Sequence, residues 1–202
     1  FFEVMGAAGL EELARVFAAC RKEGVPVLLD AKRGDIGSTA QLYAEAYLAD
    51  TDLGADALTV NASLGLDTLE PLLAMARAHD RGLFVLLRTS NPGAPTFQDG
   101  MEPMLLPFLR EEKSAGAVVG ATDPKAGARL RKALPDTLFL VPGFGAQGGT
   151  ELTPFFDEQG RGALVNSSRG ILYAGEGRDD WQDAVADAAS KAKQTIERAR
   201  TR

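Results

Sequence analysis

Short apolar runs alternate with amphipathic segments through most of this 202-residue chain, and that alternation constrains its fold more than any other feature. Six runs consist almost wholly of apolar side chains, which is typical of strands buried on both faces of a parallel sheet. We expect strands at Val25–Asp30, Ala57–Val60, Leu83–Leu87, Ala117–Val119, Leu138–Val141 and Ala163–Val165. Strands that alternate with helices predict an α/β fold whose parallel sheet is covered by helices.

The segments around these runs have helical periodicity. Leu10, Leu13 and Phe17 are spaced by three or four residues, so they mark one buried face of the first helix. Further helices are expected at Thr39–Leu48, Asp67–Ala78, Glu102–Glu112, Pro124–Leu134, Leu152–Gln159 and Trp181–Ala199. Ser38 or Thr39 is the expected N-cap of the first of these. We expect a single domain over residues 1–202 that begins with a helix rather than a strand.

Polar residues gather directly after the predicted strands rather than after the helices. Examples are Asn61-Ala62-Ser63 after the second strand and Thr89-Ser90-Asn91 after the third. A (β/α)8 barrel carries its active site at this end of its strands, but an open doubly wound sheet binds ligands there too. The pattern therefore locates a site and leaves both kinds of sheet open.

The most highly charged of these clusters begins at the end of the first predicted strand. Asp30 and Lys32 are two residues apart, so their side chains project to the same face, and Gly34 allows a turn that brings Asp35 back toward them. An ammonium between two carboxylates is held charged, whereas a third anion placed there is repelled. Such a site suits chemistry that expels a negative charge or protonates a carbanion. The alternative is a surface turn closed by a salt bridge.

A phosphate site is predicted late in the chain. The segment Gly143–Gly149 has four glycines in seven residues, which lets the backbone approach a ligand and direct N–H groups at an anion. Arg169 follows the last strand and can grip a phosphate through two hydrogen bonds. Taken singly, the glycines fit a tight turn and the arginine fits a solvated side chain, whereas together they favour a phosphate cup.

Composition excludes several other classes of protein. A formal net charge of −6 argues against a nucleic-acid surface. The single Cys20 excludes an internal disulfide and a cysteine-based metal cluster, and the single His79 excludes a multi-histidine metal site. No apolar run reaches the roughly eighteen residues of a membrane span, so we expect a cytoplasmic protein.

Four motifs together resemble the orotidine 5′-phosphate decarboxylases of a bacterial branch. They read DAKRGDIGST from Asp30, TSNPGA from Thr89, PGFGAQGG from Pro142 and SRG from Ser168, and the similarity extends from Phe1 to about Ala174. The resemblance implies a (β/α)8 TIM barrel that acts as a homodimer with shared active sites. It also implies conversion of orotidine 5′-monophosphate to UMP and CO2, the last step of pyrimidine biosynthesis, without metal or organic cofactor.

The resemblance assigns roles in catalysis to residues of the first motif. Asp30 is expected to lie against the substrate carboxylate, and Lys32 to protonate C6 of the pyrimidine as CO2 leaves. Asp35 is expected to reach the active site of the neighbouring subunit, together with Ile36 and Thr39. Loss of CO2 then relieves crowding of carboxylates while Lys32 stabilises the carbanion, so the interactions improve toward the transition state.

The other three motifs are implied to bind the substrate. Ser90 is expected to hydrogen-bond the pyrimidine and Gln147 to bridge toward the phosphate. Arg169 and the backbone of Ser168 are expected to hold the phosphate itself. Asn61 is followed by Ala-Ser where the family has Pro-Tyr, which leaves the contacts of that loop unassigned.

Three features keep alternatives open. The family's network has a further lysine and a ribose-binding aspartate that have no match in this sequence, and only six strands are predicted for an eight-stranded barrel. We expect that the sequence is trimmed at its start. The alternative functions are a Mg²⁺-dependent sister barrel, such as 3-keto-gulonate 6-phosphate decarboxylase or hexulose-phosphate synthase, and a non-catalytic barrel that binds UMP.

Overall fold

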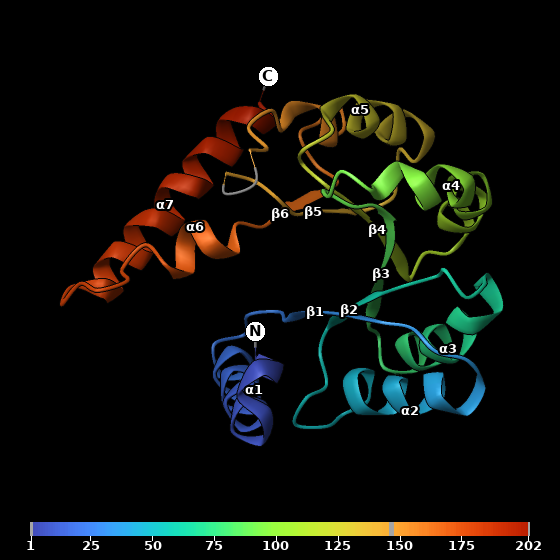
Figure 1. Ribbon diagram of the computed structural model, residues 1–202, viewed down its shortest axis with the longest axis horizontal. Coiled ribbons are helices and arrows are strands. Elements are labelled where there is room, and N and C mark those ends of the chain that lie inside the picture. Colours follow the sequence, from blue (N-terminus) through green and yellow to red (C-terminus); the bar gives the residue numbers. More distant parts are fainter. Residues whose placement is uncertain (1, 146–147, 202) are drawn as a thin grey trace. The chain divides into compact units, whose positions relative to one another are not determined.

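The computed structural model describes residues 2–145 and 148–201, and these contain one sheet whose strands follow one another in chain order (Figure 1). The strands are β1 (Leu28–Arg33), β2 (Ala57–Val60), β3 (Gly82–Arg88), β4 (Ala115–Val119), β5 (Phe139–Val141) and β6 (Ala163–Val165). Pairing is parallel between β1 and β2, β2 and β3, β4 and β5, and β5 and β6. A complete (β/α)8 barrel has eight such strands, and the described residues supply six.

Helices alternate with the strands, which confirms the predicted α/β class. They are α1 (Gly6–Lys22), α2 (Gly37–Leu48), α3 (Glu70–Ala78), α4 (Ala94–Glu111), α5 (Pro124–Ala133), α6 (Ser168–Leu172) and α7 (Trp181–Arg200). Short 3-10 helices occur at η1 (Phe2–Met5), η2 (Leu66–Leu69) and η3 (Thr153–Phe155). Among the helices described, none combines the length and the apolar character needed to cross a membrane.

The chain forms two compact units, Phe1–Leu86 and Leu87–Arg202. In the first unit, α2 packs against β1, β2 and α3. The core is built from small and branched side chains that are almost wholly excluded from solvent: Ala40, Ala44, Leu48, Leu58, Val60, Leu72, Leu73 and Ala76. A smaller cluster joins Leu13 and Phe17 of α1 to Ala55. Burial of each large apolar side chain contributes about 2 kcal/mol, so this packing fixes β1 and β2, which carry the charged cluster.

The second unit contains β4 to β6 and the helices α4 to α7. All five residues of β4 and all three of β5 are buried, which explains their continuous apolar sequence. α5 packs closely on η3, because Gly127 has no side chain: a Cβ there would lie 2.6 Å from Cε1 of Phe155. α6 packs on α7, and both follow β6 in the chain (Figure 1). Ser168 and Arg169 are the first two residues of α6.

The first strand lies later in the chain than the predicted Val25–Asp30. Val25 donates its N–H to the carbonyl of Cys20 at the end of α1, Pro26 has no N–H, and Val27 donates to the Asp56 carboxylate at 2.7 Å. The strand therefore starts at Leu28 and runs to Arg33, so the charged residues lie within it rather than after it.

Helix boundaries also differ from expectation at three places. No side chain caps α2, since its N-cap is Ile36 and not Ser38 or Thr39. The helix expected at Glu102 begins at Ala94, where Pro95 occupies a first-turn position that tolerates proline. The predicted helix Leu152–Gln159 is reduced to η3, because the Asp157 carboxylate accepts the N–H groups of Gln159 and Arg161 and turns the chain.

Candidate active site

Asp30 and Lys32 form an ion pair on β1, as their spacing predicts. Lys32 Nζ donates to Asp30 Oδ1 at 2.6 Å, and half of each side chain is exposed, at 50%. A pair this exposed adds little to the free energy of folding because water screens it. Its geometry therefore matters more for chemistry than for stability.

The pair is held by a buried residue of β2 that the sequence did not single out. Thr59 is fully buried, accepts the backbone N–H of Lys32 at 2.8 Å and donates its hydroxyl proton to Asp30 Oδ1 at 3.0 Å. Threonine is a common strand residue, so its presence in Ala57–Val60 carries no functional signal by itself. The feature of the sequence that could have identified Thr59 is its hydroxyl group, which stands in an otherwise apolar run expected to be buried.

Asp35 is not part of this pair within one chain. Its carboxylate accepts the N–H of Ile36 at 2.8 Å, and across the described residues it makes no ion pair with Lys32. The turn at Gly34 runs close to β2, since a Cβ there would lie 2.8 Å from the carbonyl oxygen of Asn61. Asp35 is half-buried, and the neighbouring Ile36 and Thr39 are exposed.

Arg33, the remaining charged residue of the motif, has a structural role. Its guanidinium pairs with Glu3 and lies over the rings of Tyr43 and Tyr47 at 5.6 and 5.4 Å. The two tyrosines belong to α2, so Arg33 connects β1 to α2. Side chains alternate along a strand, so Arg33 projects to the opposite face from Lys32 and contacts α2 instead of the ion pair.

In the second unit, the loop after β3 presents Ser90 and is held from three directions. Gln98 of α4 accepts the N–H of Thr89 at 2.9 Å and donates to its hydroxyl at 2.8 Å. Thr122 donates to the carbonyl of Ser90 at 3.0 Å. Gly120 allows close approach, since a Cβ there would lie 2.8 Å from the Ser90 nitrogen.

The glycine-rich loop after β5 has the backbone conformations for which glycine is suited. Gly143, Gly145 and Gly148 have φ values of 94°, 74° and 86°. Ser167, after β6, donates its hydroxyl to the carbonyl of Phe144 at 3.2 Å, which ties the two predicted phosphate segments together. Gln147 lies outside the described residues.

Ser168 and Arg169 begin α6, a helix that was not expected from the sequence. The Arg169 side chain is exposed, and it has no ion-pair partner among residues 2–145 and 148–201. An exposed guanidinium without a carboxylate keeps all its donors available for an anion.

A charged cluster around the buried Arg88 and Glu102 lies at the end of β3 and was not predicted. Arg88, the last residue of β3, pairs with Asp99 and Glu102 of α4, and Arg129 of α5 also pairs with Glu102. The hydrogen bonds from Arg129 hold the pKa of Glu102 below its ordinary value, although burial acts in the opposite direction. These pairs fasten α4 and α5 to the end of β3.

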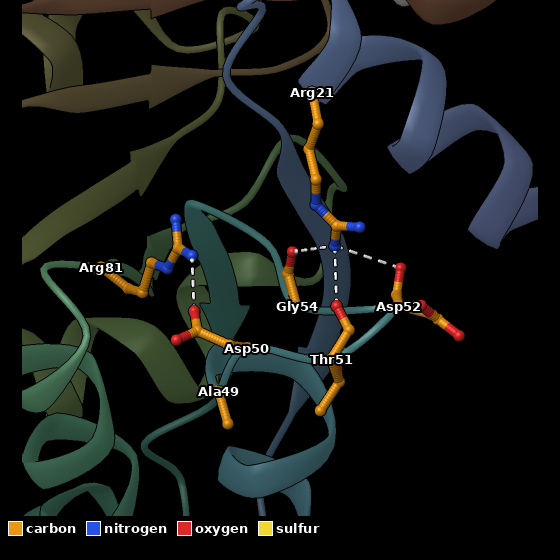
Figure 2. A pocket seen from close by; sticks show the side chains of 7 residues that line it. All are labelled: Arg21, Ala49, Asp50, Thr51, Asp52, Gly54 and Arg81. Atoms are coloured by element: carbon orange, nitrogen blue, oxygen red, sulfur yellow. Dashed lines mark hydrogen bonds and ion pairs between the residues drawn. The ribbon is translucent and has the colours of Figure 1, made fainter.

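A pocket of about 670 Å³ opens at the opposite end of the strands of the first unit (Figure 2). Arg21 donates through one nitrogen to the carbonyls of Thr51, Asp52 and Gly54 at 2.8, 3.2 and 3.0 Å. Arg81 pairs with Asp50 at 3.3 Å on the other side of the loop. These contacts fix the turn between α2 and β2.

Neither this pocket nor any other part of the described chain groups three or more His, Cys, Asp or Glu residues in an arrangement that could hold a metal ion.

Comparisons with known proteins identify the family of this chain. The model of the orotidine 5′-phosphate decarboxylase / HUMPS family matches residues 2–184. An orotidine 5′-phosphate decarboxylase of Natronomonas pharaonis is 45% identical over 206 residues, which cover 95% of this chain and 75% of that protein. The enzyme of the same name from Rhodopirellula baltica is 40% identical, with 93% and 72% covered.

A solved structure gives the same result. The OMP decarboxylase of Leishmania donovani superposes with a TM-score of 0.80 at 34% identity, over 100% of this chain and 79% of that one. The six strands described here therefore correspond to part of a TIM barrel, which decides between the two kinds of sheet in favour of the barrel. On sequence and on fold alike, this chain belongs to the orotidine 5′-phosphate decarboxylase / HUMPS family.

Proposed function

We propose that this chain is an orotidine 5′-phosphate decarboxylase, which converts orotidine 5′-monophosphate to UMP and CO2 in the cytoplasm and needs no cofactor. Curated relatives of that name share 40–46% identity with most of the chain. The observation that carries the proposal is the 2.6 Å contact between Lys32 Nζ and Asp30 on β1. A binding protein has no need of an ammonium held against a carboxylate at this position.

The residues of the pair account for both halves of the reaction. Asp30 lies beside the substrate carboxylate, so the two anions repel one another until the bond between C6 and the carboxylate breaks and CO2 departs. The electron pair left on C6 takes a proton from the Lys32 ammonium, and the resulting amine regains its proton from solvent. Both interactions favour the transition state over the ground state, which is the condition for raising the rate.

The second unit supplies the binding groups. Ser90 hydrogen-bonds the pyrimidine, and the contacts of Gln98 and Thr122 with its loop support a fixed position. The exposed Arg169 and the backbone of Ser168 bind the phosphate, and Gln147 bridges toward it. Phosphate binding far from C6 provides free energy for ordering the site around the ring.

The proposed enzyme is a homodimer whose active sites are shared. Within the described residues Asp35 makes no ion pair with Lys32 of its own chain, and the adjoining Ile36 is 63% exposed. Both facts support a role for Asp35, Ile36 and Thr39 in the neighbouring subunit's site.

The experiment is to follow the absorbance of orotidine 5′-monophosphate during incubation with the protein, with and without EDTA. Turnover at equal rates in both supports the proposal. Turnover lost in EDTA would overturn it in favour of a Mg²⁺-dependent sister enzyme, and UMP binding without turnover would leave a nucleotide-binding barrel.

A further inference from the structure

We infer that Thr59 is a positioning residue that sets the geometry of the Asp30–Lys32 pair through its single hydroxyl group. The inference rests on the proposed decarboxylase function. Thr59 touches the pair from the neighbouring strand and has no place in the motifs that suggested the active site.

The two hydrogen bonds of Thr59 have a fixed direction. A hydroxyl has one proton to donate, and the backbone N–H of Lys32 can only donate. Thr59 Oγ1 must therefore accept from Lys32 at 2.8 Å and give its own proton to Asp30 Oδ1 at 3.0 Å. Since Lys32 Nζ donates to the same oxygen at 2.6 Å, the three residues form a closed ring of hydrogen bonds.

The backbone of Lys32 needs this support. Its φ is 50°, in the left-handed region that side-chain-bearing residues rarely adopt and that persists only where surrounding contacts impose it. The register between β1 and β2 shifts between Leu29 and Arg33, so the strand is irregular at Lys32. Its N–H donates to the hydroxyl of the Thr59 side chain.

Thr59 is suited to hold a fixed position. It is 0% exposed and lies between Leu58 and Val60, which are equally buried. A β-branched side chain has few χ1 rotamers, and dense packing removes the rest. The hydroxyl is therefore fixed relative to β2, and through it both partners on β1 are fixed as well.

The test compares Thr59→Val with Thr59→Ser. Valine keeps the shape and removes both hydrogen bonds, whereas serine keeps the hydroxyl. Because small displacements of reacting groups are costly, we expect Thr59→Val to lower kcat by about tenfold to a hundredfold with the affinity for UMP unchanged, and Thr59→Ser to recover most of the loss. Thr68→Val is the control, since Thr68 is also buried but donates to the carbonyl of Gly65 away from the pair.

Wild-type kcat in Thr59→Val, or an equal loss in Thr68→Val, would overturn the inference. Crystal structures of Thr59→Val and Thr59→Ser provide a readout that is independent of turnover. We expect Lys32 to leave the left-handed region in the valine variant and to keep it in the serine variant. An unchanged Lys32 in the valine variant would contradict the inference, whereas absence of turnover in the wild-type protein would contradict only the proposed function.

Discussion

At the scale of single residues, Lys32 is the proposed proton donor. Its ammonium contacts a carboxylate and its backbone is held in a rare conformation, so few other side chains could take its place. The sequence predicted the Asp30–Lys32 contact correctly because alternation along a strand is a strong geometric rule. It could not predict the left-handed φ, which depends on a hydrogen bond from a residue 27 positions away.

Replacement of Lys32 tests its role as proton donor. We expect Lys32→Ala to reduce kcat by several orders of magnitude because it removes the proposed proton donor to C6, while UMP still binds. Turnover of orotidine 5′-monophosphate and calorimetric binding of UMP measure the two effects. Lys125→Ala, on the exposed side of α5, is the matched control and should behave as wild type. Near-normal turnover in Lys32→Ala would remove this residue from the chemistry.

At the scale of elements, buried arginines connect helices to the sheet in ways that periodicity does not show. Arg131 of α5 is directed inward and donates to five carbonyl groups, those of Leu134, Pro135, Thr137, Phe155 and Gly162. It also lies 3.8 Å from the ring centre of Phe139. Burial lowers the pKa of this guanidinium. A sequence reading assigns arginine to the solvated face of a helix, so this contact escaped prediction.

Removal of this arginine should weaken the second unit. Arg131→Ala leaves carbonyls at three chain segments without their donor, and we expect the free energy of unfolding to fall by about 3 kcal/mol. Urea denaturation monitored by circular dichroism measures the change. Lys132→Ala at the next, exposed position should change stability little. Equal stabilities of the two variants would show that water replaces the guanidinium.

Glu102 gives the same region a dependence on pH. Its pKa in the folded protein lies below the ordinary 4.5, chiefly because Arg129 donates hydrogen bonds to it. A lowered pKa contributes stability that is fully present above about pH 4.5 and is lost as pH falls through the folded value. We therefore expect Glu102→Gln to cost about 2 kcal/mol near neutrality and progressively less in acid. The free energies of unfolding of the wild type and of Glu102→Gln, measured across this pH range, test the prediction, with Glu111→Gln on the same helix as the control. A difference between the two proteins that stays constant with pH would contradict the prediction.

Strand positions were predicted well where a polar residue directly follows a short, mostly apolar run, and helix positions poorly where a side chain captures backbone N–H groups. β2 and β6 have the expected bounds, and an asparagine follows each of them directly. The helix expected at Leu152–Gln159 failed because Asp157 captures two backbone N–H groups. Such local capture depends on one side-chain rotamer, which a sequence pattern does not specify.

At the scale of the whole molecule, the proposal of a shared active site makes a distinctive prediction. If Lys32 and Asp35 of different subunits act in one site, Lys32→Ala and Asp35→Ala are each inactive as homodimers. A hybrid of the two has one site with both residues intact. When equal amounts of the two variants pair at random, half of the dimers are hybrids. Each hybrid has one active site out of two, so about a quarter of the wild-type specific activity returns. No recovery after mixing and reassociation would show that each site is built from one chain.

Because of the ring of hydrogen bonds at Thr59, the catalytic rate should also report whether β1 and β2 are folded together. Its members come from β1 and β2, so the lysine can adopt its working conformation only while those two strands are paired. A partial unfolding that separates β1 from β2 should leave most of the helices folded and yet abolish catalytic activity. On gradual heating, the rate of CO2 release should consequently decline at a lower temperature than the helical signal, and the gap between the two curves measures how loosely β1 is attached.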